Sequence, residues 1–262
     1  MRFDVITLFP ELFAPFLTSG VTRRAFEASL VDVKLWNPRD FSEGNYRRVD
    51  DRPFGGGPGM VMLAEPLALC LEQIHADRRT KLESHAPDAP DAPVVLFSPV
   101  GTALNHAGVE AWSGSTGAVL ICGRYEGLDQ RFIDRYVDQQ ISLGDFVLSG
   151  GEIAAMALLD AIARLQPGVL NDEGSHQLDS FNPALDGLLD CPHYTRPDVW
   201  RDQSVPAPLL SGNHARIECW RREQRLTLTQ NQRPELVIAA RNAGQLSRAD
   251  EIFLSAQAKT SC

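Results

Sequence analysis

The sequence predicts an α/β fold, with a parallel sheet covered by helices and a small, mostly helical domain after it. Short continuous apolar runs, such as VVLFS at 94–98 and AVLIC at 118–122, are typical of strands that are buried on both faces of a parallel sheet. Segments with the 3.6-residue period of amphipathic helices alternate with these runs. Beyond about residue 186 the helical pattern continues without further strand signals.

The first part of the chain shows strand and helix signals separated by polar loops. The glycine run at 55–59 cannot form regular structure and indicates backbone that lies close to another group. Pro66 suits the first turn of a helix whose apolar residues recur with helical spacing from Leu67. The expected order is a strand at 3–9, a strand at 31–36, a polar loop at 37–53, the glycine run, a helix from 66, and a polar linker or insertion at 77–93.

The middle of the chain alternates clearly between strands and helices. Asn105 and the pair Gly150–Gly151 stand where helices are expected to begin, and Pro167–Gly168 where the last of them ends. The expected order is a strand at 94–98, a short helix from 105, a strand at 118–122, a helix at 129–137, a weaker strand at 141–144, and a helix at 152–165.

These elements divide the chain into three parts. We expect a sheet domain at 1–168, a polar linker or mobile lid at 169–186, and a helical domain at 187–262. In the helical domain, Asn213 should cap a helix that runs through Arg225, and Pro234 should open the next helix.

Composition and charge narrow the class of protein. The formal net charge of -9 argues against a surface coated with basic residues, although it leaves room for a local basic groove. Five scattered cysteines without C-x-x-C spacing indicate reduced thiols and no cysteine metal site. The first residues lack the pattern of a signal peptide, and no apolar stretch approaches the ~20 residues of a membrane span, so we expect a cytoplasmic protein.

Four glycine-bearing loops follow a predicted strand or precede a predicted helix. Ligands bind at the carboxyl ends of strands in open α/β sheets, and glycine lets the backbone donate hydrogen bonds directly to a ligand. Any one loop could serve only as a tight turn, whereas four on one sheet favour a small-molecule pocket. The loops are Ser98–Gly101, Gly123–Gly127, Leu143–Leu148 and Ser149–Glu152.

Several common catalytic motifs do not occur in the sequence. It has no G-x-G-x-x-G after a strand, no G-x-x-x-x-G-K-[ST] and no G-x-S-x-G, which disfavours the common hydride, phosphoryl and acyl-transfer enzymes. Cys191 and His193 form a C-x-H pair without further ligands at zinc spacing, so we expect them to pack structurally.

The same loops resemble a known family. The strings DRPFGGGPGMVM, GRYEGLDQR, ISLGDFVLSGGE, EGSHQLDSF, GLLDCPHYTRP and LLSGNHARIECWRR are similar to those of bacterial tRNA (guanine-N1)-methyltransferases. The similarity runs from Phe3 to about Leu236. It implies a sheet domain with a deep trefoil knot of the SPOUT class and a homodimer. It also implies methyl transfer from S-adenosylmethionine to N1 of guanosine 37 of tRNA, when another guanosine precedes it. Threaded chains are rare, so the residues alone would not predict a knot.

The resemblance also implies which residues bind the cofactor. They lie in the strand-end loops described above, and they are Leu96, Phe97, Ser98, Pro99, Gly101, Gly123, Tyr125, Glu126, Gly127, Leu143, Gly144, Asp145, Phe146, Val147, Leu148, Gly150 and Gly151. Magnesium is a further cofactor that the family implies. The sequence shows no dedicated carboxylate cage, so we assign no metal ligands.

Two residues are expected to act on the guanine. Guanine N1 carries a proton near neutral pH, so a base must accept it as the methyl group arrives, and by resemblance this base is Asp179. Negative charge then develops on O6, where the resemblance places Arg164. Without the resemblance, Asp179 would be interpreted as an Asx-turn residue. Arg164 would equally suit a helix C-terminus, four residues after Asp160.

RNA contacts are expected from two segments. The residues are Asp50, Arg52, Gly59, Met60, Arg216 and Arg221, with Arg47 and Arg48 near the first group and Arg222 and Arg225 near the last. Arginines around Trp220 form a basic and aromatic mixture that suits an RNA contour, although each could instead belong to a solvated helix face.

Two alternatives to the tRNA N1 enzyme stay open at this point. One is another SPOUT-type RNA methyltransferase, and the other is a non-catalytic tRNA-binding protein of the same fold. In the main interpretation the partners are tRNA and a second copy of the chain, with no membrane and no DNA.

Overall fold

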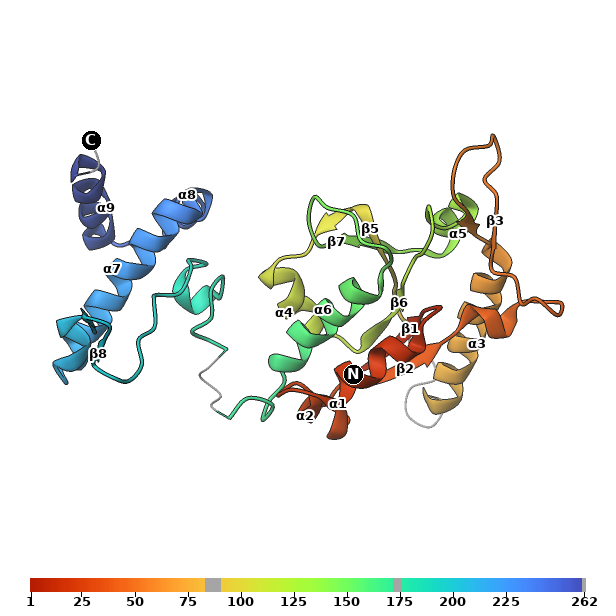
Figure 1. Cartoon of the computed structure of the whole chain (residues 1–262), viewed down its shortest axis with the longest axis horizontal. Helices are drawn as coiled ribbons and strands as arrows, with labels where there is room; N and C mark the ends of the chain where they lie inside the picture. The colour runs from red at the N-terminus through yellow and green to blue at the C-terminus, as the bar shows by residue number, and fades with distance from the viewer. Residues whose placement is uncertain (83–90, 172–175, 261–262) are drawn as a thin grey trace. The chain divides into compact units, whose positions relative to one another are not determined.

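The computed structural model describes residues 1–82, 91–171 and 176–260, and it forms two compact units (Figure 1). The first unit spans Met1–Leu170 and the second Asn171–Cys262. The linker or lid predicted at 169–186 is thus divided between the units, since the second unit begins at Asn171.

The first unit is built on a five-stranded parallel sheet in the order β2-β1-β6-β5-β7. Its strands are β1 (Arg2–Ile6), β2 (Asp32–Trp36), β5 (Val94–Ala103), β6 (Gly117–Ile121) and β7 (Gln139–Ser142). The central strand β6 is apolar and buried at every position, as expected for a strand covered on both faces. The predicted α/β class with a parallel sheet is confirmed.

Helices cover both faces of this sheet (Figure 1). They are α1 (Phe13–Thr18), α2 (Arg23–Glu27), α3 (Ala64–Leu82), α4 (His106–Ser113), α5 (Gln130–Tyr136) and α6 (Glu152–Arg164), and a short antiparallel pair, β3 (Asp50–Asp51) and β4 (Val61–Met62), lies before α3. Neighbouring residues of a strand point to opposite faces, so Leu120 packs in the core with α4 and α6, and Ile121 in the core with α3 and α5.

Helix α3 continues through residues 77–82, where polar composition predicted a linker. That prediction was wrong for these residues because their charges are paired with the sheet. Asp77 Oδ2 lies 2.7 Å from Arg2 Nη2, and Arg78 Nε lies 2.6 Å from Asp4 Oδ2. Asp4 is fully buried, so the pairing ties α3 to β1. The rest of the predicted linker, 83–90, lies outside the described residues.

Strand β5 is also longer than predicted and includes Ser98–Gly101, which the sequence predicts as a loop. The pairing with β7 shifts within this segment, since Phe97 and Thr102 both lie opposite Ile141. A Cβ on Gly101 would lie only 2.5 Å from the carbonyl carbon of Gln140. The absence of a side chain therefore lets this segment pass close to β7.

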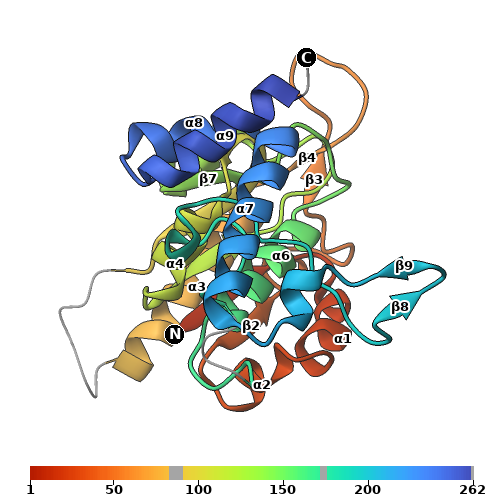
Figure 2. The same cartoon turned by 90° about the vertical axis from the view of Figure 1, so that its left-hand side faces the viewer.

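The second unit is mostly helical. It contains α7 (His214–Gln232), α8 (Pro234–Asn242), α9 (Arg248–Thr260) and an antiparallel pair, β8 (Val199–Trp200) and β9 (Gln203–Ser204), which extends away from α7 in Figure 2. Asn213 caps α7 as predicted, accepting a hydrogen bond from the backbone N–H of Arg216. The helix runs past the predicted end at Arg225. Among the described residues, no helix is both long and apolar enough to cross a membrane.

Candidate active site

A cavity of about 530 Å³ opens at the carboxyl edge of the sheet in the first unit. Its walls come from the end of β5, the loop after β6 and the segment between β7 and α6. All of the residues predicted to bind the cofactor line it, except Gly101, Gly144 and Asp145. A volume of this size is typical of small-molecule sites. The structure therefore brings residues of all four predicted loops together around one cavity.

Several polar residues of this wall were not predicted from the sequence. They are Arg124, Gln130, Gln140, Ser142 and Ser149. Each lies within or beside a predicted loop, so proximity to the glycines was the signal that could have identified them. Arg124 and Glu126 are the charged residues among those that line the cavity.

The two glycine-rich walls of the cavity meet backbone to backbone. The N–H of Gly151 donates to the carbonyl oxygen of Gly123 over 3.0 Å, and a β-bridge joins Arg124 to Gly150. A Cβ on Gly151 would lie 2.7 Å from the Cα of Cys122. Burial, reinforced by the negative charge of Glu152, raises the pKa of the Cys122 thiol well above its usual range. The thiol therefore stays protonated, and Cys122 contributes to packing and not to nucleophilic chemistry.

The glycine run at 55–59 lies against the loop after β6. The N–H of Glu126 donates to the carbonyl oxygen of Met60, and the N–H of Met62 donates to that of Gly127, both over 2.9 Å. Gly59 has a φ of +81°, and a Cβ there would overlap the Glu126 side chain. Gly59 and Met60, predicted to contact RNA, are thus packed against a predicted cofactor loop.

Other arginines near the glycine run are already paired. Arg47 Nη1 lies 3.0 Å from Asp40, and Arg48 Nη2 lies 2.6 Å from Asp51. Asp50 is partly buried in β3, whereas Arg52 is exposed.

Arg164 lies at the opposite end of α6 from the cavity. The helix begins at Glu152, directly after Gly150 and Gly151, and Arg164 is its last residue. With a rise of 1.5 Å per residue, about 18 Å separate the two ends. Within one copy of the chain, α6 therefore does not bring Arg164 to its own glycine wall.

Asp179 belongs to the second unit. Its backbone forms a turn, since its N–H donates to His176 O over 3.4 Å and its carbonyl oxygen accepts from Asn182 N over 3.2 Å. The turn precedes a short 3-10 helix at Pro183–Leu185.

A second pocket, of about 490 Å³, lies within the second unit. Tyr194 and Trp220 both line it, with their ring centroids 6.1 Å apart in an edge arrangement. Arg221 also lines this pocket, whereas Arg216 does not. Aromatic faces beside arginines suit contact with nucleic acid.

Two of the arginines predicted near Trp220 serve the fold of the second unit. Arg222 lies 2.7 Å from Asp186 and 3.0 Å from Asp250, and Arg225 is buried 3.3 Å from Asp190. Their charges are thus matched by carboxylates of the same unit, and contact of these two arginines with RNA stays a prediction.

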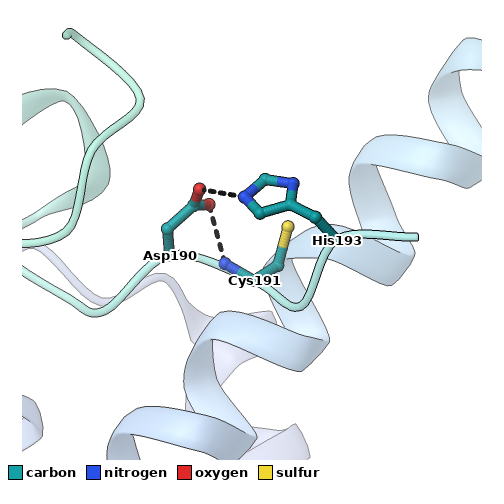
Figure 3. A group of neighbouring side chains, drawn as sticks. All are labelled: Asp190, Cys191 and His193. Atoms are coloured by element: carbon teal, nitrogen blue, oxygen red, sulfur yellow. Dashed lines mark hydrogen bonds and ion pairs between the residues drawn. The ribbon is translucent and has the colours of Figure 1, made fainter. Parts of the chain in front are cut away.

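Asp190, Cys191 and His193 place possible metal-ligand atoms within 4.8 Å of one another (Figure 3). Asp190 already accepts hydrogen bonds from the Cys191 N–H and from Arg225, and its Oδ2 lies 2.9 Å from His193 Nε2. Burial acts to raise the pKa of Asp190, but these hydrogen bonds outweigh it and hold the pKa below its usual range. Hydrogen bonds thus satisfy the carboxylate, and mixed S, N and O atoms do not suit magnesium. We assign no metal to the described residues.

Known proteins resemble this chain over nearly its whole length. The family model described as tRNA (Guanine-1)-methyltransferase TrmD matches residues 1–239. A protein named tRNA (guanine-N(1)-)-methyltransferase from Polaromonas sp. (strain JS666 / ATCC BAA-500) is 78% identical over 255 residues, covering 97% of this chain and 96% of that protein. Proteins of the same name from Albidiferax ferrireducens and Paracidovorax citrulli are 72% and 71% identical, covering 98% and 97% of this chain and 100% and 98% of their own lengths.

Proposed function

Because the chain belongs to the tRNA (guanine-1)-methyltransferase family, we propose that it transfers a methyl group from S-adenosylmethionine to N1 of guanosine 37 in tRNA. The observation that carries this proposal is the cavity in the first unit, which gathers nearly all of the predicted cofactor residues. Because the proposed substrate is a tRNA, which acts in the cytoplasm, we also propose that the protein is cytoplasmic.

The cavity fits S-adenosylmethionine in size and chemistry. Its glycine walls offer backbone N–H and C=O groups to an adenine and a ribose, and Phe97, Leu143 and Leu148 offer apolar surface. A Cβ on Gly150 or Gly151 would overlap neighbouring atoms, so the wall has no room for side chains at these positions. When bound, the cofactor supplies an electrophilic methyl group on a sulfonium.

Asp179 and Arg164 then act on the guanine. Asp179 accepts the N1 proton, which leaves N1 with a lone pair for attack on the methyl carbon. Arg164 donates hydrogen bonds to O6, where negative charge accumulates as the proton leaves. Holding the base in line with the methyl group contributes further to the rate.

The position of Arg164 supports a homodimer. Since about 18 Å of helix separate this residue from the glycine wall of its own chain, a second copy could place its Arg164 beside the cavity. We propose that the active site is completed in this way. The sheet order and the contact of the 143–151 segment with the end of β6 support the trefoil knot that we propose for the first unit.

Two regions are proposed to bind tRNA. Gly59 and Met60 pack against the loop after β6, and Asp50 pairs with Met62 in the adjoining strands. Arg52 lies two residues after Asp50 in the sequence. In the second unit, Arg216 and Arg221 share α7 with Trp220, whose ring lines the second pocket. The first region would present the target base and the second would hold the rest of the tRNA.

Methyl transfer to defined tRNA transcripts tests the proposal. The protein is incubated with S-adenosylmethionine and transcripts that carry guanosine or adenosine at position 36, and the methylated nucleosides are identified by mass. We expect N1-methylguanosine only with guanosine 36, and none with Asp179→Ala or Arg164→Ala. A different methylated nucleoside would favour another RNA methyltransferase, and tRNA binding without methylation would favour a non-catalytic protein.

A further inference from the structure

A buried ion pair joins the walls of the cofactor cavity, and the reaction proposed above does not use it. Arg124 follows Gly123 in the loop after β6, and Glu152 stands in the first turn of α6. Arg124 Nη2 lies 2.8 Å from Glu152 Oε2, with side chains that are 18% and 1% exposed. Opposite charges at this distance interact strongly where little water screens them.

Three loops of the sheet edge meet at this pair. The Thr7 hydroxyl, after β1, donates to Glu152 Oε1 over 2.9 Å. Arg124 Nη1 donates to the carbonyl oxygen of Ser149 over 3.1 Å, and its guanidinium lies 4.5 Å from the centroid of the Phe9 ring. The pair therefore fixes the loop after β6 to the end of the 143–151 segment and to the loop after β1.

The Arg124 side chain lies against the backbone of the cavity wall, so the position of the wall depends on the ion pair with Glu152. A Cβ on Gly150 would lie 2.5 Å from Arg124 Cδ, so the side chain passes directly over the Gly150 backbone. Gly150 and Gly151 line the cavity, and Arg124 lines it too. Glu152 does not line the cavity. A substitution at Glu152 therefore changes the ion pair that positions the cavity wall and leaves the residues that line the cavity unchanged.

We propose that Arg124 and Glu152 are a positioning pair that holds the two glycine walls at the separation needed to admit S-adenosylmethionine. This inference rests on the proposed function, because it takes S-adenosylmethionine as the ligand. Glu152 acts through Arg124 and the backbone of Gly150 and touches no reacting atom.

Binding of S-adenosylmethionine to the full-length Glu152→Gln variant tests the pair. This change keeps the shape of the side chain and removes its charge. Titration calorimetry, run well below the melting temperature, should give a dissociation constant at least ten times that of the wild type. Glu27→Gln is the matched control, since Glu27 forms an exposed pair with Arg23 at 3.8 Å and lies outside the cavity lining. Its dissociation constant should equal that of the wild type.

A second variant separates positioning from mere stability. Thr7→Val removes the hydroxyl that orients Glu152 and leaves both charges in place, and Thr7 does not line the cavity. It should also weaken S-adenosylmethionine binding, by a smaller factor, and it decides the matter if Glu152→Gln does not fold. Variants that melt at lower temperature but keep the wild-type dissociation constant would show that the pair only stabilises the fold, and would overturn the inference. A wild type that binds no S-adenosylmethionine would instead overturn the proposed function itself.

Discussion

Gly151, the residue directly before α6, allows a quantitative test of how closely the cavity walls pack. A Cβ on Gly151 would lie 2.7 Å from the Cα of Cys122 and 3.2 Å from the backbone nitrogen of Gly123. Favourable contacts between carbon atoms lie at about 3.5–4.0 Å, so Gly151→Ala must move the start of α6 away from β6 by about 1 Å. Both neighbours are backbone atoms, so no side chain can rotate to make room.

Overpacking of this kind costs about 1–3 kcal/mol. For a unit of this size each kcal/mol corresponds to a change of roughly 2–4 °C in melting temperature, so Gly151→Ala should melt several degrees below the wild type. Because the same shift moves a cavity wall, S-adenosylmethionine should also bind more weakly. Thermal unfolding followed by circular dichroism, together with calorimetric titration, measures both effects.

Gly108→Ala is the matched control for this substitution. Gly108 lies inside α4, and a Cβ there would meet its nearest neighbour, Asn105 Oδ1, at an ordinary 3.5 Å. The change should stabilise the helix by about 0.5–1 kcal/mol and leave cofactor binding unchanged. A Gly151→Ala protein with the stability and affinity of the wild type would refute the packing that the structure shows.

Three further predictions concern charge, thiol reactivity and RNA. The hydrogen bond from Lys34 lowers the pKa of Asp77 below its ordinary value of 3.8, so this carboxylate stabilises the fold above that pH and loses its effect as the pH falls through the folded pKa. Asp77→Asn should therefore lower the free energy of unfolding at neutral pH, and its difference from the wild type should vanish in acid titrations. Burial raises the pKa of Cys70 to about 12, so peptide mapping after iodoacetamide treatment should find exposed Cys219 modified and Cys70 modified only on unfolding. Trp220→Ala should weaken tRNA binding in a gel-shift assay without changing S-adenosylmethionine affinity; equal tRNA affinity would exclude the second pocket as an RNA contact.

Hydrophobic patterning predicted the central strands of the sheet most clearly, because β6 and the first residues of β5 are continuous buried apolar runs. Local pattern could not predict where charged residues are satisfied by distant partners. Asp77 and Arg78 have the composition of a linker, yet they form the end of a helix because Arg2 and Asp4 of β1 pair with them. Arg222 is a similar case, since its partner Asp250 lies 28 residues away in the sequence.

In the candidate site, too, local sequence predicted the loops but not the residues that each loop contacts. The glycines around Gly123 and Gly150 marked their loops in the sequence, because a backbone that approaches another backbone excludes side chains. The partner that each loop approaches was not encoded locally. The contact of Gly59 with Glu126, and the pair formed by Arg124 and Glu152, depend on the order of strands in the sheet.

Hydrogen–deuterium exchange of the full chain, with and without S-adenosylmethionine, tests most directly whether the cavity in the first unit is the cofactor site. The structure predicts slower exchange on ligand addition in the 96–101, 123–127 and 143–151 segments, which contain most of the residues that line it. Exchange in α7 and in the second pocket should not change. Protection confined to the second unit, or none at all at saturating ligand, would contradict the assignment of this cavity.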